Sequence, residues 1–114
     1  MEEDSEPRKQ LIFVGRALEE IKAFPGDVMQ EAGYNIDLVQ CGKEPSDWKP
    51  FRGVGRGGVK EIRLWDDSGT YRVVYLVDLK DTVCVLCGFK KTSEKTEKAH
   101  TDLIKKRIKQ MNEQ

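Results

Sequence analysis

Hydrophobic and polar residues alternate in the middle of the chain, and this alternation predicts a β-hairpin followed by a third strand. Apolar side chains recur at alternate positions over Val59–Trp65 and over Thr70–Val77, and Asp66–Gly69 between them has the composition of a tight turn. Thr82–Phe89 predicts the third strand. The short apolar segment Leu11–Val14 is rich in residues that favour β structure and predicts a buried strand near the N-terminus.

Helical spacing of the apolar residues follows this first strand. Apolar side chains three and four positions apart predict a helix over Arg16–Phe24, which the next two residues, Pro and Gly, end. Asp27 is a suitable N-cap for a second helix that runs to about Gln40. Within that helix Gly33 weakens the pattern, so we expect close packing or a bend there.

The remaining segments predict a loop and a C-terminal helix. Residues 42–58 contain several glycines and two prolines, and they predict a mobile loop that Trp48 and Phe51 anchor on the core. The glycine cluster lacks the Gly-Lys-Ser/Thr ending of a phosphate-binding loop. A helix is expected over about residues 94–111, with Ser93 as its candidate N-cap.

These elements predict one α+β domain over residues 10–112, with a small antiparallel sheet, an N-terminal helical hairpin packed on it and a C-terminal helix. Residues 1–9 are acidic and polar, and we expect them to be disordered. The 114 residues fit one domain. The longest apolar run is far too short to cross a bilayer, and the acidic start is unlike a secretory signal, so we expect no membrane association and a cytoplasmic protein.

The three cysteines do not predict a metal or disulfide site. Cys84 and Cys87 have the C-x-x-C spacing, but they belong to the predicted third strand. Residues three apart in a regular strand point to opposite faces, so we expect two small apolar thiols that share neither a metal nor a disulfide. Nothing else in the sequence implies a cofactor.

The charges are balanced overall but distributed unevenly. The formal net charge is zero, yet residues 1–58 carry 8 basic and 11 acidic groups whereas residues 59–114 carry 12 basic and 9 acidic groups. A local basic field of this kind can attract a polyanion. It can equally be the solvated face of the last helix, so composition leaves both interpretations open.

The register of the hairpin gives the first candidate site. If Asp66 faces Gly69 across the turn, Arg63 faces Arg72, and both side chains lie on the face opposite the apolar one. Like charges directly across a ladder repel each other, which is favourable only if an anion lies between them. Two alternatives stay open: Glu61 on the same face can neutralise one arginine, and a loop one residue longer would change the pairing.

Two lysines add to this site. Lys90 and Lys91 directly follow the third strand, and an antiparallel partner would bring them near Arg72. Four cations from three strand segments would then converge at one edge of the sheet.

At this point the sequence resembles a known family. The runs Gly33-Tyr-Asn-Ile-Asp-Leu-Val-Gln-Cys-Gly42 and Pro45-Ser-Asp-Trp-Lys-Pro50 are similar to those of phage-derived HigB-like toxins of the RelE superfamily. So are the later runs Val59-Lys-Glu-Ile-Arg-Leu64, Gly69-Thr-Tyr-Arg-Val-Val-Tyr75, Phe89-Lys-Lys-Thr92 and Lys95-Thr96. The segments come in the family's order and cover roughly residues 11–110.

This resemblance implies a RelE-like fold and a ribosome-dependent messenger-RNA endonuclease that a cognate antitoxin, of the helix-turn-helix HigA type, neutralises. The family's basic working positions correspond to Arg63, Arg72 and Lys91. Lys90, Trp65 and Lys95 are the expected RNA contacts. Trp65 can stack a base, and a packing role for this side chain stays equally open. Our hypothesis for the reaction needs no metal: the RNA 2′-hydroxyl attacks the adjacent phosphorus, and the arginines bind the phosphate. Lys91 or Lys90 either assists the leaving group or, if neighbouring cations lower its pKa, acts as the base.

The sequence departs from the family pattern in two places. Many relatives have histidine where this chain has Cys87, and pairing the last two strands with residue numbers that sum to about 159 would place that position opposite Arg72. A terminal tyrosine also has no counterpart. The only histidine, His100, is expected at the surface of the last helix, away from the cations.

Three alternatives stay open: a RelE-fold module that binds RNA or a partner without catalysis, a ParE-like inhibitor of DNA gyrase, and a structural adaptor. The missing histidine and tyrosine favour the first. The mapping of cut RNA ends separates the first from an endonuclease. The retained arginines and lysines argue mildly against the second, and little beyond the balanced charge supports the third.

Overall fold

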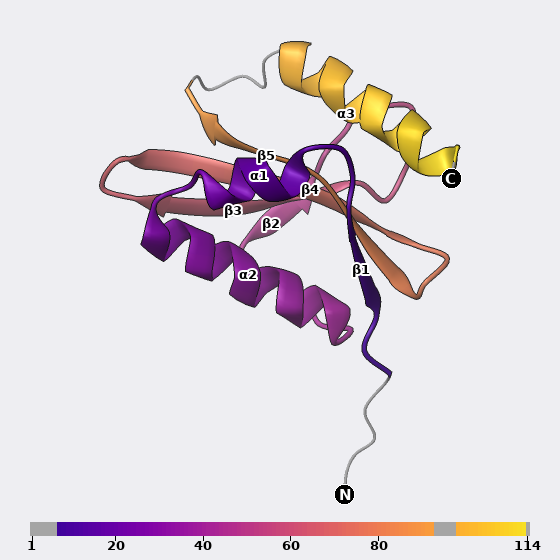
Figure 1. Ribbon diagram of the computed structural model, residues 1–114, viewed down its shortest axis with the longest axis horizontal. Helices are drawn as coiled ribbons and strands as arrows, with labels where there is room; N and C mark the ends of the chain where they lie inside the picture. Colours follow the sequence, from indigo (N-terminus) through magenta and orange to yellow (C-terminus); the bar gives the residue numbers. More distant parts are fainter. Residues whose placement is uncertain (1–6, 93–97, 114) are drawn as a thin grey trace, which may run out of the picture.

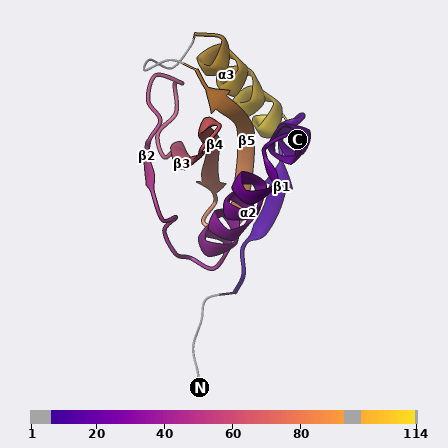
Figure 2. The same cartoon turned by 90° about the vertical axis from the view of Figure 1, so that its left-hand side faces the viewer.

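The computed structural model describes residues 7–92 and 98–113 of the chain, which form a five-stranded sheet between two layers of helices (Figures 1 and 2). The strands lie in the order β1-β5-β4-β3-β2. In chain order the elements are β1 (Gln10–Phe13), α1 (Ala17–Lys22), α2 (Gly26–Gln40), β2 (Trp48–Pro50), β3 (Lys60–Asp66), β4 (Gly69–Asp78), β5 (Thr82–Lys91) and α3 (Lys98–Asn112).

The α+β class is confirmed, with two differences in the sheet. β1 pairs with β5 in parallel, so the sheet is mixed. This parallel pairing is possible because α1 and α2 follow β1 in the chain and provide a long connection to the other strands. The predicted loop over residues 42–58 also contains the short strand β2, which pairs antiparallel with β3. Pro50 is compatible with β2 because this strand lies at the edge of the sheet.

Each face of the sheet has its own hydrophobic core. α1 and α2 pack on one face, where Ile21, Val28 and Ile36 meet side chains such as Ile62 and Val73. α3 packs on the other face, where Ile104 and Ile108 meet side chains that include Leu76, Leu86 and Val74. Figure 1 shows α2 and α3 on opposite sides of the sheet. The strands of the middle of the sheet are therefore buried on both faces, which explains their nearly continuous apolar sequence.

The second helix differs from the prediction at two residues. It begins at Gly26 with Pro25 in the N-cap position, so Asp27 lies in the first turn and is not the cap. A carboxylate in the first turn still suits the positive end of the helix dipole. Gly33 is exposed, and a Cβ there would meet no atom within 4 Å, so the expected close packing is absent.

A bulge in β5 changes the faces of the two strand cysteines. Val74 pairs with Cys87 and Tyr75 with Val85, so Leu86 has no partner in the register. Such an extra residue lets neighbouring side chains point to the same side. Cys84 and Cys87 consequently both lie in the core under α3, and the prediction that they face opposite sides was wrong. Both thiols are free and buried, as expected for small apolar side chains.

The glycine-rich loop and residues 7–9 both contact the rest of the fold. Phe51 is buried and anchors the glycine-rich loop as predicted, whereas Trp48 is only partly buried in β2. Of the N-terminal residues expected to be disordered, the structure describes 7–9. There the Lys9 N–H donates to the Gln40 carbonyl oxygen at 2.8 Å, and Arg8 forms an ion pair with Asp37, so these residues contact the end of α2. Within the described residues, the helices are all too short or too polar to span a membrane.

Candidate functional site

The β3–β4 hairpin has the predicted register, and this register brings two arginines together. Asp66 pairs with Gly69, Trp65 with Thr70 and Arg63 with Arg72. The side chains of Arg63 and Arg72 therefore lie on the same face of the sheet, which is the face that α3 partly covers. The turn is closed by Asp66, whose Oδ1 accepts hydrogen bonds from the Ser68 N–H at 2.8 Å and the Ser68 hydroxyl at 2.6 Å.

Each of these arginines contacts a carboxylate. Asp47 Oδ1 accepts from Arg63 Nε at 3.0 Å and lies 3.0 Å from an Arg63 terminal nitrogen. Arg72 Nε lies 3.4 Å from Glu61 Oε1, and Arg72 also donates to the Tyr71 carbonyl oxygen at 3.2 Å. The alternative with Glu61 as a counter-ion is therefore confirmed for Arg72, and Arg63 has Asp47 as a counter-ion, whereas a phosphate contact by these arginines stays a prediction.

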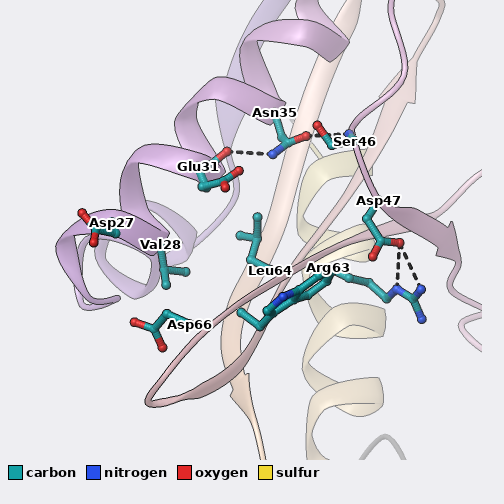
Figure 3. A pocket seen from close by; sticks show the side chains of 10 residues that line it. Asp27, Val28, Glu31, Asn35, Ser46, Asp47, Arg63, Leu64 and Asp66 are labelled. Carbon is teal, nitrogen blue, oxygen red and sulfur yellow. Dashed lines mark hydrogen bonds and ion pairs between the residues drawn. The ribbon is translucent and has the colours of Figure 1, made fainter.

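Asp47 is a residue that the sequence analysis missed as an arginine partner. The Arg63 N–H donates to the Asp47 carbonyl oxygen at 2.9 Å, so the segment directly before β2 continues the pairing with β3. Figure 3 shows how α2 holds this segment: the buried Asn35 amide donates to the Glu31 carbonyl oxygen and accepts from the Ser46 N–H, both at 2.8 Å. A strand assigned at residues 48–50 would have indicated this contact.

The two lysines after β5 lie on opposite faces of the sheet. Lys91 pairs with Thr70 and shares the face of the arginines, whereas Lys90 pairs with Tyr71 on the face of α1 and α2. There the Lys90 Nζ lies 5.9 Å from the centroid of the Tyr71 ring. The expected convergence of four cations therefore does not include Lys90. A strand's side chains alternate between faces, which separates neighbouring residues of this kind.

A fourth cation comes from β2, which was not predicted as a strand. Lys49 pairs with Glu61 across β2 and β3, and its Nζ lies 3.4 Å from Glu61 Oε1. We call Lys49, Arg63, Arg72 and Lys91 together the basic face. The carboxylates of Asp47 and Glu61 offset two of these four positive charges, so the basic face keeps an excess of two positive charges. Such an excess can attract a phosphate backbone.

Burial and charge act together on Lys91. Its pKa is lowered below the ordinary lysine value, first because the side chain is partly buried and second because the Arg72 guanidinium lies nearby. Lys49 and Arg63 lower this pKa further, and Glu61 acts in the opposite direction. A lysine with a lowered pKa gives up its proton more readily, which suits proton transfer.

Trp65 and His100 are aromatic side chains that lie beside the basic face. Trp65 is 63% exposed on the side of the basic face, so its ring is accessible to a stacking partner. His100 is not the isolated surface residue that we expected: its ring stacks on Phe89 with a centroid distance of 3.8 Å, and Phe89 pairs with Arg72. The start of α3 therefore lies beside the basic face. The predicted contact Lys95 and the predicted cap Ser93 lie outside the described residues.

The register of β5 also corrects the position of Cys87. It pairs with Val74 and not with Arg72, because the actual pairs from Lys91 to Cys87 have residue numbers that sum to 161. Burial raises the pKa of the Cys87 thiol to about 12. A thiol in this state is neither a nucleophile nor a proton donor near neutral pH. Within the described residues, no cluster of three or more potential metal ligands occurs.

A cavity adjoins the basic face between β2 and α3. It has a volume of about 380 Å³ and is lined by Lys49, Pro50, Phe51, Arg52, Glu61 and Thr101. A second cavity, of about 260 Å³, lies on the other side of Arg63 between α2 and the hairpin, and Figure 3 shows its acidic residues Asp27, Glu31 and Asp66. The charges of its walls are unsuited to a polyanion, so of these two cavities the first is the one that can extend a nucleic-acid site.

Comparisons with known proteins agree with this architecture. The family described as "Phage derived protein Gp49-like (DUF891)" matches residues 19–109 of the chain. A mutant of the Escherichia coli toxin RelE in the free state is similar in structure, with a TM-score of 0.58 and 20% identity over 91% of this chain and 98% of that chain. The toxin–antitoxin complex RelBE2 from Mycobacterium tuberculosis gives a TM-score of 0.51 and 22% identity over 79% of this chain and 100% of that chain. No curated protein matches the chain in sequence.

Proposed function

The chain belongs to the Gp49-like family of phage-derived proteins, and we propose on this basis that it is the toxin of a type II toxin–antitoxin system. Its activity would be the ribosome-dependent cleavage of messenger RNA, as the resemblance to HigB-like toxins implies. The single observation that carries this proposal is the position of Arg63, Arg72 and Lys91 on one face of three adjacent strands of a RelE-like fold. Arginine and lysine at short range are the side chains that bind a nucleic-acid backbone.

The exposures of these side chains suggest different roles. The Arg63 side chain is 39% exposed and can contact a phosphate while it keeps its bond to Asp47. The Arg72 side chain is only 8% exposed, so it acts on the phosphate mainly through its charge from below the surface. This division refines the expectation that both arginines bind the phosphate in the same way.

The reaction that fits these groups is an intramolecular phosphoryl transfer in the RNA, from the 5′-oxygen to the 2′-oxygen. The 2′-hydroxyl gives its proton to a solvent water while its oxygen attacks the neighbouring phosphorus, the bond from phosphorus to the 5′-oxygen breaks, and a cyclic phosphate and a 5′-hydroxyl result. The arginines offset the negative charge that grows on the phosphate oxygens. Lys91 donates the proton that the leaving 5′-oxygen takes up.

A cognate antitoxin is the proposed protein partner. The matched Mycobacterium tuberculosis structure is a complex of a toxin with its antitoxin, and this chain spans the whole length of the matched subunit. We propose a helix-turn-helix antitoxin of the HigA type, and a cytoplasmic location in which ribosomes and messenger RNA are accessible.

Controlled expression in a bacterial host tests this function. The wild-type protein should arrest growth, Arg72→Ala and Lys91→Ala should relieve the arrest, and co-expression of a cognate antitoxin should suppress it. Lys22→Ala, on α1 at the other face of the sheet, is the matched control and should arrest growth like the wild type. Full toxicity in both variants of the basic face would refute the assignment of the site.

Two observations favour a second candidate, a RelE-fold module that binds RNA without cutting it. Both arginines are engaged by carboxylates, and β5 offers a buried thiol at Cys87, where the family resemblance implies an imidazole in many relatives. Incubation of the purified protein with ribosomes and message distinguishes the two candidates. Binding without new RNA ends would favour the module, and new ends would favour the endonuclease.

A further inference from the structure

A buried carboxylate lines the cavity between β2 and α3. Glu61 is 1% exposed and lies on β3, where it pairs with Lys49 of β2. Its Oε1 atom lies 3.4 Å from both Lys49 Nζ and Arg72 Nε, but among the described residues neither carboxylate oxygen accepts a hydrogen bond. Two acceptor oxygens at the wall of this cavity can therefore receive hydrogen bonds from the N–H groups of a ligand.

A carboxylate without hydrogen bonds is costly at this position if its only role is packing. A charged group loses its hydration on burial, and ion pairs without good hydrogen bonds regain little of that loss. Val74, the residue that pairs with Glu61 on β4, belongs to the hydrophobic core under α3, so an apolar side chain would suit position 61 as well. The carboxylate therefore points to a ligand that supplies the missing hydrogen bonds.

The cavity has the size and the walls that suit a nucleobase. Its volume of about 380 Å³ lies within the range of about 300–1,000 Å³ that small-molecule sites occupy. Pro50 and Phe51 supply apolar surface on which a flat ring can pack, and the Thr101 hydroxyl on α3 can donate or accept a hydrogen bond. The exposed Arg52 at the same cavity can contact the negative backbone to which a base is attached.

The order of donors and acceptors on the wall distinguishes the four bases. The Lys49 ammonium group donates hydrogen bonds, and the Glu61 carboxylate beside it offers two acceptors. The complementary ligand edge has one acceptor followed by two N–H donors, which is the Watson–Crick edge of guanine, with O6, N1–H and the N2 amino group. Adenine, cytosine and uracil each have a single donor group on that edge, next to acceptor atoms that a carboxylate repels.

Resting on the proposed ribonuclease function, we propose that this cavity binds a guanine base of the RNA substrate, with Glu61 accepting from its N1–H and N2 amino groups. Lys49 then donates to O6, and because this long side chain is about half exposed, its rotation can open the carboxylate to the base. Glu61 and Arg63 lie two residues apart on one face of β3, which corresponds to about 7 Å. A base in the cavity would therefore belong to a nucleotide beside the phosphate that Arg63 contacts.

NMR titration of the isotope-labelled full chain with nucleoside 3′-monophosphates tests the guanine site without ribosomes. The guanosine nucleotide should bind about 10-fold or more tightly than those of adenosine, cytidine and uridine, and should shift the signals of Phe51 and Thr101. The inosine nucleotide lacks the N2 amino group and the 1-methylguanosine nucleotide lacks the N1 proton, so both should bind more weakly than the guanosine nucleotide. Equal affinities for guanosine and these two analogues, or no binding of any nucleotide, would overturn the proposal.

Two matched variants assign the preference to the buried carboxylate. Glu61→Gln replaces one acceptor oxygen with a donor amide and should remove most of the preference for guanine. Glu44→Gln makes the same chemical change in an exposed ion pair with Lys60 and should keep the preference. A guanine preference that survives in Glu61→Gln, or that disappears equally in Glu44→Gln, would refute the role of Glu61. The two nucleotide analogues keep the proposal testable if Glu61→Gln does not fold.

Cleavage assays separate this inference from the proposed function. If the wild-type protein cuts ribosome-bound message, guanine should occupy one fixed position relative to the cut, and Glu61→Gln should lose this preference. Cut sites without a preferred guanine would refute only the inference. Guanine-selective binding by a protein that never cuts RNA would refute the ribonuclease function and leave the guanine site intact.

Discussion

Arg107 links α3 to the rest of the fold, and its removal is the perturbation with the clearest expected cost. One terminal nitrogen of Arg107 donates to Glu20 Oε1 and to the Leu86 carbonyl oxygen, both at 2.8 Å, and the other donates to Glu20 Oε2 at 2.7 Å. Glu20 Oε1 also accepts from the Gly88 N–H at 3.1 Å. Arg107 therefore joins α3, α1 and the bulge of β5 through one buried guanidinium.

The cost of Arg107→Ala follows from the groups that lose their partners. The Leu86 carbonyl oxygen would be left without a partner in the core, at a cost of about 1–3 kcal/mol. Breaking a fully buried ion pair costs about 3–5 kcal/mol, but the Glu20 side chain is 26% exposed and can regain some hydration. We therefore expect a loss of about 2–4 kcal/mol in the free energy of unfolding.

Urea unfolding followed by circular dichroism measures this loss. With an m-value of about 2 kcal/mol per M, typical of a small domain, the midpoint should fall by about 1–2 M. The control Lys98→Ala removes an exposed ion pair with Asp102 on the same helix and should leave the midpoint unchanged. A loss below about 0.5 kcal/mol for Arg107→Ala, as for an ordinary surface substitution, would show that this link does not hold α3.

Three further predictions concern other parts of the fold. Alkylation of the native protein should modify Cys41, which is exposed, and spare the two buried β5 cysteines, whereas all three react in denaturant; intact-mass measurement counts the labels. Gly88→Ala should lower the free energy of unfolding by about 1–3 kcal/mol. The reason is that a Cβ at this position would lie 2.9 Å from an Ile21 side-chain carbon. Gly57 has open space around it, so Gly57→Ala should cost less in the same unfolding assay. Lys90→Ala should reduce RNA cleavage less than the same substitution at the neighbouring Lys91, since the two side chains lie on opposite faces; equal losses would contradict the described geometry.

The hairpin is the part of the site that the sequence predicted in detail. A short polar turn between two alternating strands determines which residues pair, so the pairing of Arg63 with Arg72 and the composition of both faces could be derived from local pattern alone. The apolar faces of α1, α2 and α3 were likewise predictable, because helical spacing shows which side of a helix is buried.

Contacts between distant segments were not predictable in the same way. The bulge at Leu86 changes the register of β5, and the Leu86 carbonyl oxygen accepts a hydrogen bond from Arg107, which lies 21 residues later in the chain on α3. Asp47 reaches Arg63 only because β2 pairs with β3, and three residues with one proline in them do not indicate a strand. Glu61 was recognised as a possible counter-ion, but its complete burial depends on the packing of β2 and α3 over it.

The most direct test of the proposed function is the mapping of RNA ends after a single-turnover reaction with programmed ribosomes. The wild-type protein should produce fragments with a 5′-hydroxyl at one end and a cyclic phosphate at the other. Lys91→Ala should slow cleavage by about 100-fold or more, as expected for the loss of a proton donor. Intact message with the wild-type protein, or equal rates for the wild type and Lys91→Ala, would contradict an RNA-cleaving role of the basic face.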